Sequence, residues 1–125
     1  MRAGRPIRRA VPSAAPGRVL EHPKPEEIRL EAVLHALADP VRLQVVRRLA
    51  ELGTEAPCSA IELAVSKSTS TYHFRVLREA GVITQVYRGT AKMNALRRDD
   101  LDRLFPGLLD AVLAADAAQR RRTGA

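Results

Sequence analysis

A capped helix followed directly by a β-hairpin, in residues 66–96, is the feature that most constrains how this chain can fold. Ser66 is of the residue type that caps helix N-termini, and Gly81 stands where a glycine ends a helix of about 14 residues. Two β-rich runs follow within residues 82–96, on either side of Arg88-Gly89-Thr90, where glycine suits a tight turn. The segment therefore predicts one helix and one two-stranded hairpin in direct succession.

Three helical segments are predicted before residue 66. The first begins near Pro25 and has one apolar face, formed by Leu30, Val33, Leu34, Leu37 and Val41. Asp39 and Pro40 interrupt this pattern as the N-cap and first residue of a second helix, which runs to Gly53. Ser59 followed by Glu62 is a capping-box pattern and predicts a very short helix through Ala64.

A last amphipathic helical region is predicted from Asp99 to about Gln119, with a break at Pro106. The resulting order is helix, helix, short helix, helix, hairpin, helix, which is the order of a winged helix-turn-helix. We therefore expect a mainly α fold of this class, with a two-stranded β-hairpin as the wing. Residues 26–119 form the predicted domain, between a disordered basic arm over 1–25, which holds five prolines, and a basic tail over 120–125.

The charge of the chain favours a polyanionic partner, but most of the excess lies near the two ends. The formal net charge is +7 and the isoelectric point is about 10.7. Residues 1–25 contribute six basic and one acidic side chain, and Arg120, Arg121 and Arg122 add three positive charges at the other end. The middle is nearly neutral, so a nucleic-acid interface has to be argued from local placement of charge.

The predicted helix after Ser66 has the residue types of a helix that enters the major groove. One side carries Ser70, His73, Phe74 and Leu77, which would anchor it on the core, and the other side is polar and basic. Two cations flank the hairpin tip, where a wing would lie along the DNA backbone. The candidate DNA-binding residues are Ser66, Lys67, Ser68, Thr69, Thr71, Tyr72, Arg75 and Arg78 on the helix, and Arg88 and Lys92 on the hairpin.

Two segments resemble the arsenical-resistance-repressor (ArsR/SmtB) family of winged-helix regulators: LHALADPVRL at 34–43 and VLREAG at 76–81. The resemblance covers roughly residues 28–97. It implies a homodimer built by the first and last helices, DNA binding by residues 66–78, and an inducer that lowers operator affinity. On this basis we expect a dimeric repressor bound to a palindromic operator in double-stranded DNA, released by a signal that the sequence does not identify.

The sequence argues against a metal sensor and against an enzyme. Where metal-sensing relatives carry a Cys-x-Cys pair, this chain has Cys58 and then Ala60, and only three histidines are scattered along it. We expect no metal site, no cofactor and no catalytic residues, because phosphate-binding loops and nucleophile motifs are missing from the sequence. Cys58 is either a small buried hydrophobe or a redox sensor, and His73 is either structural or phosphate-facing.

Two further expectations concern location and an alternative function. A single cysteine and the lack of any long apolar run predict a cytoplasmic protein without a membrane partner. The nearly neutral middle of the chain leaves open a different class of function, a winged-helix module that binds protein and not DNA. Steep weakening of DNA binding by salt would separate the two.

Overall fold

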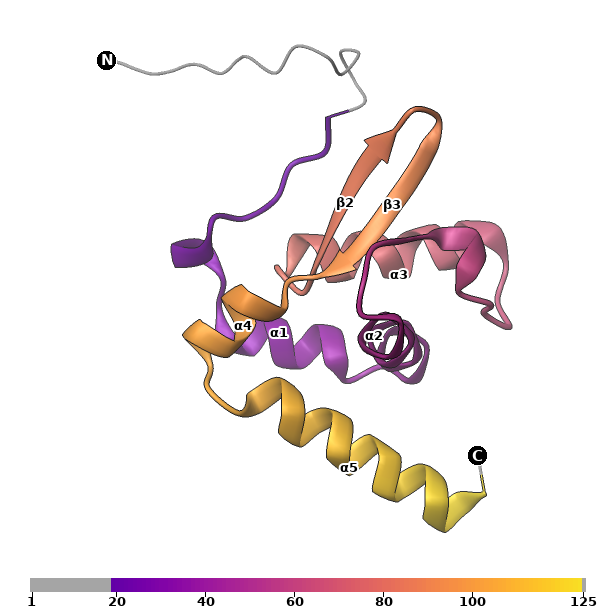
Figure 1. Cartoon of the computed structure of the whole chain (residues 1–125). Coiled ribbons are helices and arrows are strands. Elements are labelled where there is room, and N and C mark those ends of the chain that lie inside the picture. Colours follow the sequence, from indigo (N-terminus) through magenta and orange to yellow (C-terminus); the bar gives the residue numbers. More distant parts are fainter. Residues whose placement is uncertain (1–18, 125) are drawn as a thin grey trace.

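The computed structural model describes residues 19–124, and most of the predicted arm, residues 1–18, lies outside this range. Figure 1 shows the hairpin projecting on one side of the helices and the last helix crossing the other side. Eight of the elements after the short turn Pro25–Glu27 position the candidate site, and their order confirms the winged-helix prediction. They are α1 (Leu30–Leu37), α2 (Pro40–Leu52), β1 (Ala56–Pro57), α3 (Lys67–Glu79), β2 (Ile83–Arg88), β3 (Ala91–Leu96), α4 (Arg98–Leu104) and α5 (Leu108–Thr123).

The ends of α2 and α3 form as the sequence predicts. The Asp39 carboxylate accepts hydrogen bonds from the backbone N–H groups of Val41 and Arg42, at 2.8 and 3.1 Å, and thus caps α2. Ser66 Oγ accepts from the Thr69 N–H at 3.2 Å and caps α3. Gly81, just past the end of α3, has φ +87°, the left-handed conformation that lets the chain turn sharply into β2.

The hairpin is part of a three-stranded antiparallel sheet in the order β1-β3-β2. β2 and β3 pair from Ile83 opposite Leu96 to Arg88 opposite Ala91, and Gly89 and Thr90 form the turn. The third strand, β1, has only two residues and pairs Ala56 with Asn94. This strand was not predicted from the sequence, because such a short strand is defined only by its distant partner.

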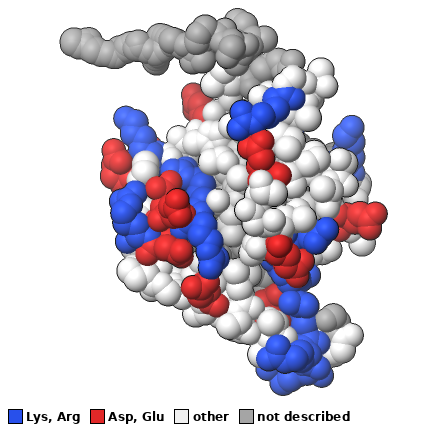
Figure 2. Space-filling model, in the orientation of Figure 1, with Lys and Arg blue, Asp and Glu red and all other residues white. Residues whose placement is uncertain are grey.

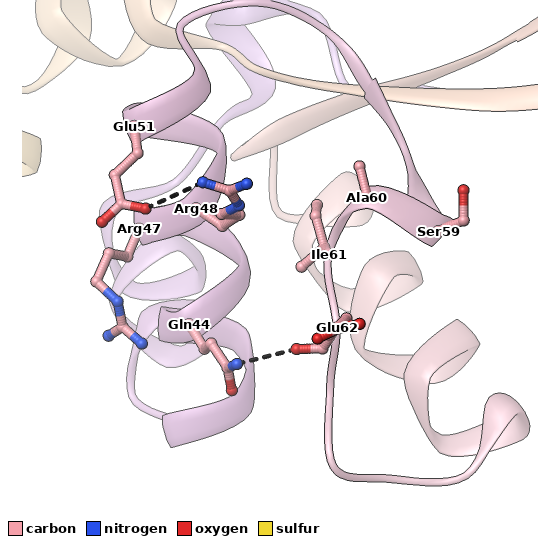
Figure 3. A pocket seen from close by; sticks show the side chains of 8 residues that line it. All are labelled: Gln44, Arg47, Arg48, Glu51, Ser59, Ala60, Ile61 and Glu62. Atoms are coloured by element: carbon pink, nitrogen blue, oxygen red, sulfur yellow. Dashed lines mark hydrogen bonds and ion pairs between the residues drawn. The ribbon is translucent and has the colours of Figure 1, made fainter.

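The short helix predicted from Ser59 through Ala64 does not form. Cys58–Ala60 make a single 3-10 turn, Ile61 is buried, and the chain then runs to Ser66 without a helix. Gln44 of α2 donates to the Glu62 carbonyl oxygen at 3.0 Å (Figure 3). Because Ser66 already caps α3, too few residues remain upstream to offset the cost of starting another helix.

The N-terminal part of the domain also differs from the prediction. The first helix begins at Leu30, after the 3-10 turn. Within the predicted arm, His22 Nε2 accepts a hydrogen bond from the Gln85 N–H at 2.9 Å, and Arg97 donates to the Pro23 carbonyl at 2.8 Å. Residues 22–25 are therefore attached to the domain. At the other end α5 continues through Arg120, Arg121 and Arg122, which the sequence analysis placed in a tail.

The core lies between α1, α2 and α3 and the inner face of the sheet, and it is almost wholly aliphatic. Its fully buried members include Val33, Val45, Val46, Leu77 and Ile83. α5 packs along the domain through Leu109 and through Asp116, which accepts from Arg47 of α2 at 2.9 Å. Among the described helices, none combines the length and the apolar character needed to cross a bilayer.

Candidate nucleic-acid interface

One side of α3 is fixed in the core, as the sequence predicts. Phe74 and Leu77 are 2% and 0% exposed, and His73 is 8% exposed. Arg42 Nη1 lies 3.1 Å from His73 Nδ1, which must be the acceptor because a guanidinium can only donate. The structure thus places His73 in a structural role between α3 and α2. A helix held in this way presents a defined opposite side to solvent.

The opposite side of α3 is polar, basic and exposed. Lys67, Thr71, Tyr72 and Arg75 are all exposed there. The Arg75 guanidinium lies over the Tyr72 ring, with its carbon 5.5 Å from the ring centre. This contact holds the positive charge of Arg75 beside a phenol that can also donate a hydrogen bond.

The first turn of α3 carries a cluster of three hydroxyl groups. Ser66 Oγ donates to Thr69 Oγ1 at 2.9 Å and lies 3.3 Å from Ser68 Oγ. Ser66, Ser68 and Thr69 are exposed, as predicted, but part of their hydrogen-bonding capacity serves the helix cap. The backbone N–H groups at this end of α3 and the adjacent Lys67 make the end attractive to anions.

The two predicted wing cations have partners within the chain. Arg88 donates to both carboxylate oxygens of Glu55, at 2.7 and 3.0 Å. This pairing lowers the pKa of Glu55 and raises that of Arg88, chiefly through the side-chain hydrogen bond. The ammonium of Lys92 lies 5.8 Å from the centre of the Tyr87 ring. Arg88 is nevertheless exposed, so its charge can still be approached from solvent.

Arg78 is not on the exposed side with the other candidates. Its side chain is half-buried and turns toward the hairpin, where Nη1 donates to Gln85 Oε1 at 2.6 Å. Helical spacing alone puts Arg78 one turn after Arg75 and therefore predicted a position on the polar side. The partner that draws it inward, Gln85, is on another element and could not be seen from the helix pattern.

A groove of about 560 Å³ separates α3 from the hairpin and from residues 58–65. Lys67, Ser70 and Thr71 of α3 line one wall, and Lys92 of β3 lines the other. Of the candidate DNA-binding residues, the groove brings together Lys67 and Thr71 of the helix and Lys92 of the wing, and the others lie outside it.

Two further groups of charged side chains are visible on the face of the described residues that Figure 2 shows. Figure 2 shows acidic and basic side chains interspersed over α4, and a basic cluster at the C-terminal end of α5. That cluster consists of Arg120, Arg121 and Arg122. Within residues 19–124, His, Cys, Asp and Glu side chains form no group of three that could hold a metal ion.

Comparison with known proteins shows what the chain is similar to. Residues 37–86, which span α2, α3 and part of the wing, match a family model described as a helix-turn-helix domain. The chain is 33% identical over 89 residues to the HTH-type transcriptional regulator YceK of Bacillus subtilis (strain 168), covering 70% of this chain and 88% of YceK. It is 30% identical over 88 residues to the arsenical resistance operon repressor of the same organism, covering 69% and 84% of the two chains.

A solved structure supports the fold independently. The crystal structure of an ArsR family transcriptional regulator superposes with a TM-score of 0.53 at 23% identity, covering 77% of this chain and 97% of that one. The chain belongs to the ArsR family of helix-turn-helix transcriptional regulators and is a DNA-binding regulator of transcription.

Proposed function

We propose that the protein is a homodimeric repressor that inserts the two copies of α3 into successive major grooves of a palindromic operator. The observation that carries this proposal is the division of α3 into a buried side, with Phe74 and Leu77, and an exposed polar side, with Thr71 and Arg75. A two-fold dimer matches half-sites about 10–10.5 base pairs apart. The similarity to an arsenical resistance operon repressor supports repression as the outcome of binding.

The proposed contacts fall into two groups. Lys67, Thr71, Tyr72 and Arg75 read or approach base edges from α3, with Ser66, Ser68 and Thr69 at the phosphates near its first turn. Arg88 and Lys92 lie along the DNA backbone beside the major groove that α3 enters. We assign Arg78 a different role, described in the next subsection. In this proposal the protein acts in the cytoplasm and has no catalytic residue, cofactor or metal.

The dimer interface is proposed on apolar side chains that the single chain leaves uncovered. Leu30 and Leu34 of α1 are 43% and 45% exposed and stand one helical turn apart. Ala111, Ala114 and Ala115 of α5 are exposed as well. A second copy would cover both helices, which is the arrangement that the family resemblance implies. The palindrome requires this symmetry, since each half-site is read by one α3.

A salt titration with matched variants tests the DNA contacts. Operator DNA is selected from a random duplex pool, and binding is measured by gel shift from low to moderate salt. Arg75→Ala should weaken binding by about tenfold to a hundredfold if Arg75 reads guanine, and should lower the salt slope by about one if it binds a phosphate. Glu79→Ala, an exposed change on the same helix, is the control and should not weaken binding. Operator affinity that is unchanged in Arg75→Ala and Lys67→Ala would refute the assignment of α3.

Sedimentation equilibrium tests the dimer. The full chain should sediment as a dimer, and Leu30→Glu combined with Leu34→Glu should shift it to a monomer. The double variant should bind a half-site with the affinity of one wild-type subunit but lose the joint affinity for the full operator. A wild-type chain that stays monomeric at operator-saturating concentrations would contradict the proposal.

A further inference from the structure

The sheet contains a row of buried amide side chains in an otherwise aliphatic core. Gln85 on β2 and Asn94 on β3 are directly opposite each other and are 1% and 0% exposed. Gln85 Nε2 donates to Asn94 Oδ1 at 2.8 Å, and Asn94 Nδ2 donates to the Ala56 carbonyl of β1 at 3.2 Å. The same Nδ2 lies 3.2 Å from Cys58 Sγ. The row thus crosses all three strands at one level.

This row continues into α3 through Arg78. Its Nη1 donates to Gln85 Oε1 at 2.6 Å, from the last turn of the helix. Gln85 is also held from the other side, since its backbone N–H donates to His22 Nε2 at 2.9 Å. Gln85 is therefore the point where α3, the N-terminal segment and the wing meet.

Buried amides are costly unless they are paired, and an aliphatic pair of similar volume would serve stability equally well. What the polar row adds is a defined orientation of the strands and of α3 relative to one another, because its hydrogen bonds form in only one arrangement. The chain passes from α3 to β2 through Ala80, Gly81 and Val82. The backbone N–H groups of Gly81 and Val82 donate to the carbonyl oxygens of Arg78 and Leu77, at 3.0 and 2.9 Å. The bond from Arg78 to Gln85 adds a side-chain link across this short connection.

We propose that Arg78 is a positioning residue, which fixes the angle between the wing and α3 through Gln85 and Asn94. The charge of Arg78 is directed into the protein, and its contribution to DNA binding is indirect. It holds Lys92, across the groove from Lys67, at the distance where both cations meet one DNA backbone. This inference rests on the proposed wing contact for its DNA readout, but the angle itself is a property of the free protein.

The angle can be measured without DNA. In the full chain, backbone N–H residual dipolar couplings of residues 83–96, compared with those of residues 67–79, report the mean orientation and the spread of the hairpin. Arg78→Met keeps the aliphatic length but removes the hydrogen bond, so the couplings of the hairpin should shrink relative to those of α3. Arg75→Met is the control and should leave them unchanged. Couplings in Arg78→Met that match the wild type would overturn the proposal, whatever the DNA result.

Operator binding provides the second readout. Arg78→Met should weaken binding by about tenfold and lower the salt slope by about one, as Lys92→Met does, because Lys92 then no longer reaches its phosphate. Lys92→Met should weaken the wild type but have no further effect in the Arg78→Met background. An equal effect of Lys92→Met in both backgrounds would overturn the positioning role. If Lys92→Met leaves wild-type affinity unchanged while the couplings still shrink, the wing contact in the proposed function fails and the positioning role stands.

Gln85→Met gives a variant at a residue that is 1% exposed. Its effect on operator affinity should match that of Arg78→Met, and the double variant should be no weaker than either single variant, because both remove one link. Circular dichroism at the binding temperature confirms that each variant is folded. Additive effects of the two changes would show that they act separately and would overturn the proposal.

Discussion

The guanidinium of Arg42 and the imidazole of His73 meet 3.1 Å apart inside the domain, and they join α2 to the helix proposed to read DNA. Arg42 is 6% exposed. It also donates to the carbonyl oxygens of Ala36 and His35, at 2.7 and 3.2 Å, and so caps the C-terminal end of α1. One buried side chain thus holds three helices together.

Arg42→Met should therefore destabilise the domain by about 3 kcal/mol, because it leaves buried acceptors without a donor. Urea unfolding followed by circular dichroism measures this loss. Arg48→Met is the matched control on the same helix, since Arg48 is exposed and only paired with Glu51 at 3.5 Å; it should change stability by less than about 0.5 kcal/mol. Equal losses in the two variants would contradict the structural role of Arg42.

The buried carboxylate of Asp116 should make the free energy of unfolding depend on pH. Burial alone would raise its pKa, but hydrogen bonds from Arg47 and Arg120 outweigh this and hold the pKa below its ordinary value. A carboxylate with a depressed folded-state pKa contributes stability that is complete above its unfolded pKa and is lost as pH falls through the folded one. Asp116→Asn should cost about 1–3 kcal/mol at pH 7.

The difference between wild type and Asp116→Asn should begin to narrow at about pH 4, around the ordinary pKa of an Asp carboxyl, and should narrow further as pH falls through the lower folded-state pKa. Thermal unfolding of both proteins across this range provides the measurement. Asp110→Asn, at an exposed position of the same helix, is the control for a general loss of negative charge. A gap that stays constant with pH would show that Asp116 acts through packing and not through its charge.

Substitutions at two glycines with positive φ allow the cost of backbone strain to be separated from the cost of a steric clash. At Gly53 (φ +68°) an added Cβ meets nothing within 4 Å, whereas at Gly81 (φ +87°) it would lie 2.6 Å from Cγ1 of Ile28. Gly53→Ala should cost about 1 kcal/mol from strain, and Gly81→Ala about 1–3 kcal/mol more from the clash. Denaturant unfolding of both variants tests this, and equal costs would mean that Ile28 moves aside freely.

Glu55→Gln should strengthen operator binding. Glu55 neutralises Arg88 near the tip of the wing through two hydrogen bonds, and its removal frees a cation and removes a negative charge near DNA. We expect an increase in affinity of about twofold to fivefold at low salt, with a steeper salt dependence. The matched control is Glu51→Gln on α2, an exposed acid paired with Arg48, which should leave affinity unchanged. Weaker binding in Glu55→Gln would mean that the ion pair itself shapes the wing.

Two deletions test the basic N-terminal residues. Residues 1–18 hold Arg2, Arg5, Arg8, Arg9 and Arg18 and no acid, so their removal should lower operator affinity and flatten its salt dependence without altering the thermal midpoint. Removal of residues 1–24 should also lower the midpoint, because Gln85 N–H and Arg97 lose their partners His22 and Pro23. Equal operator affinity of the wild type and of both deletion variants would show that residues 1–24 do not contribute to DNA binding.

The parts of the fold that follow from local chemistry were predictable from the sequence. Asp39-Pro40 starts α2, Ser66 and Gly81 bracket α3, and the glycine at 89 marks the hairpin turn, because caps and turns depend on neighbouring residues. The buried side of α3 was predictable for the same reason, since helical spacing alone separates Phe74 from Arg75.

The errors arise where partners distant in the sequence decide the structure. The segment after Ser59 has a capping-box pattern, yet β1 pairs Ala56 with Asn94 and Gln44 takes the Glu62 carbonyl, and both interactions hold it out of a helix. Arg78 has the spacing of a DNA contact, but Gln85 draws it inward. One signal was available in the sequence: Gln85 is polar, yet it lies on the same side of β2 as Ile83, which points to the core.

The amide row also has a consequence for how the hairpin aligns during folding. A slip of β2 by two residues against β3 keeps every side chain on its own face, so the aliphatic pattern alone penalises it only weakly. Such a slip would set Gln85 opposite Lys92 or Leu96 in place of Asn94. Gln85 Nε2 would then lose its acceptor and Asn94 Oδ1 its donor inside the protein, and the misaligned pairing would be eliminated before the wing is complete.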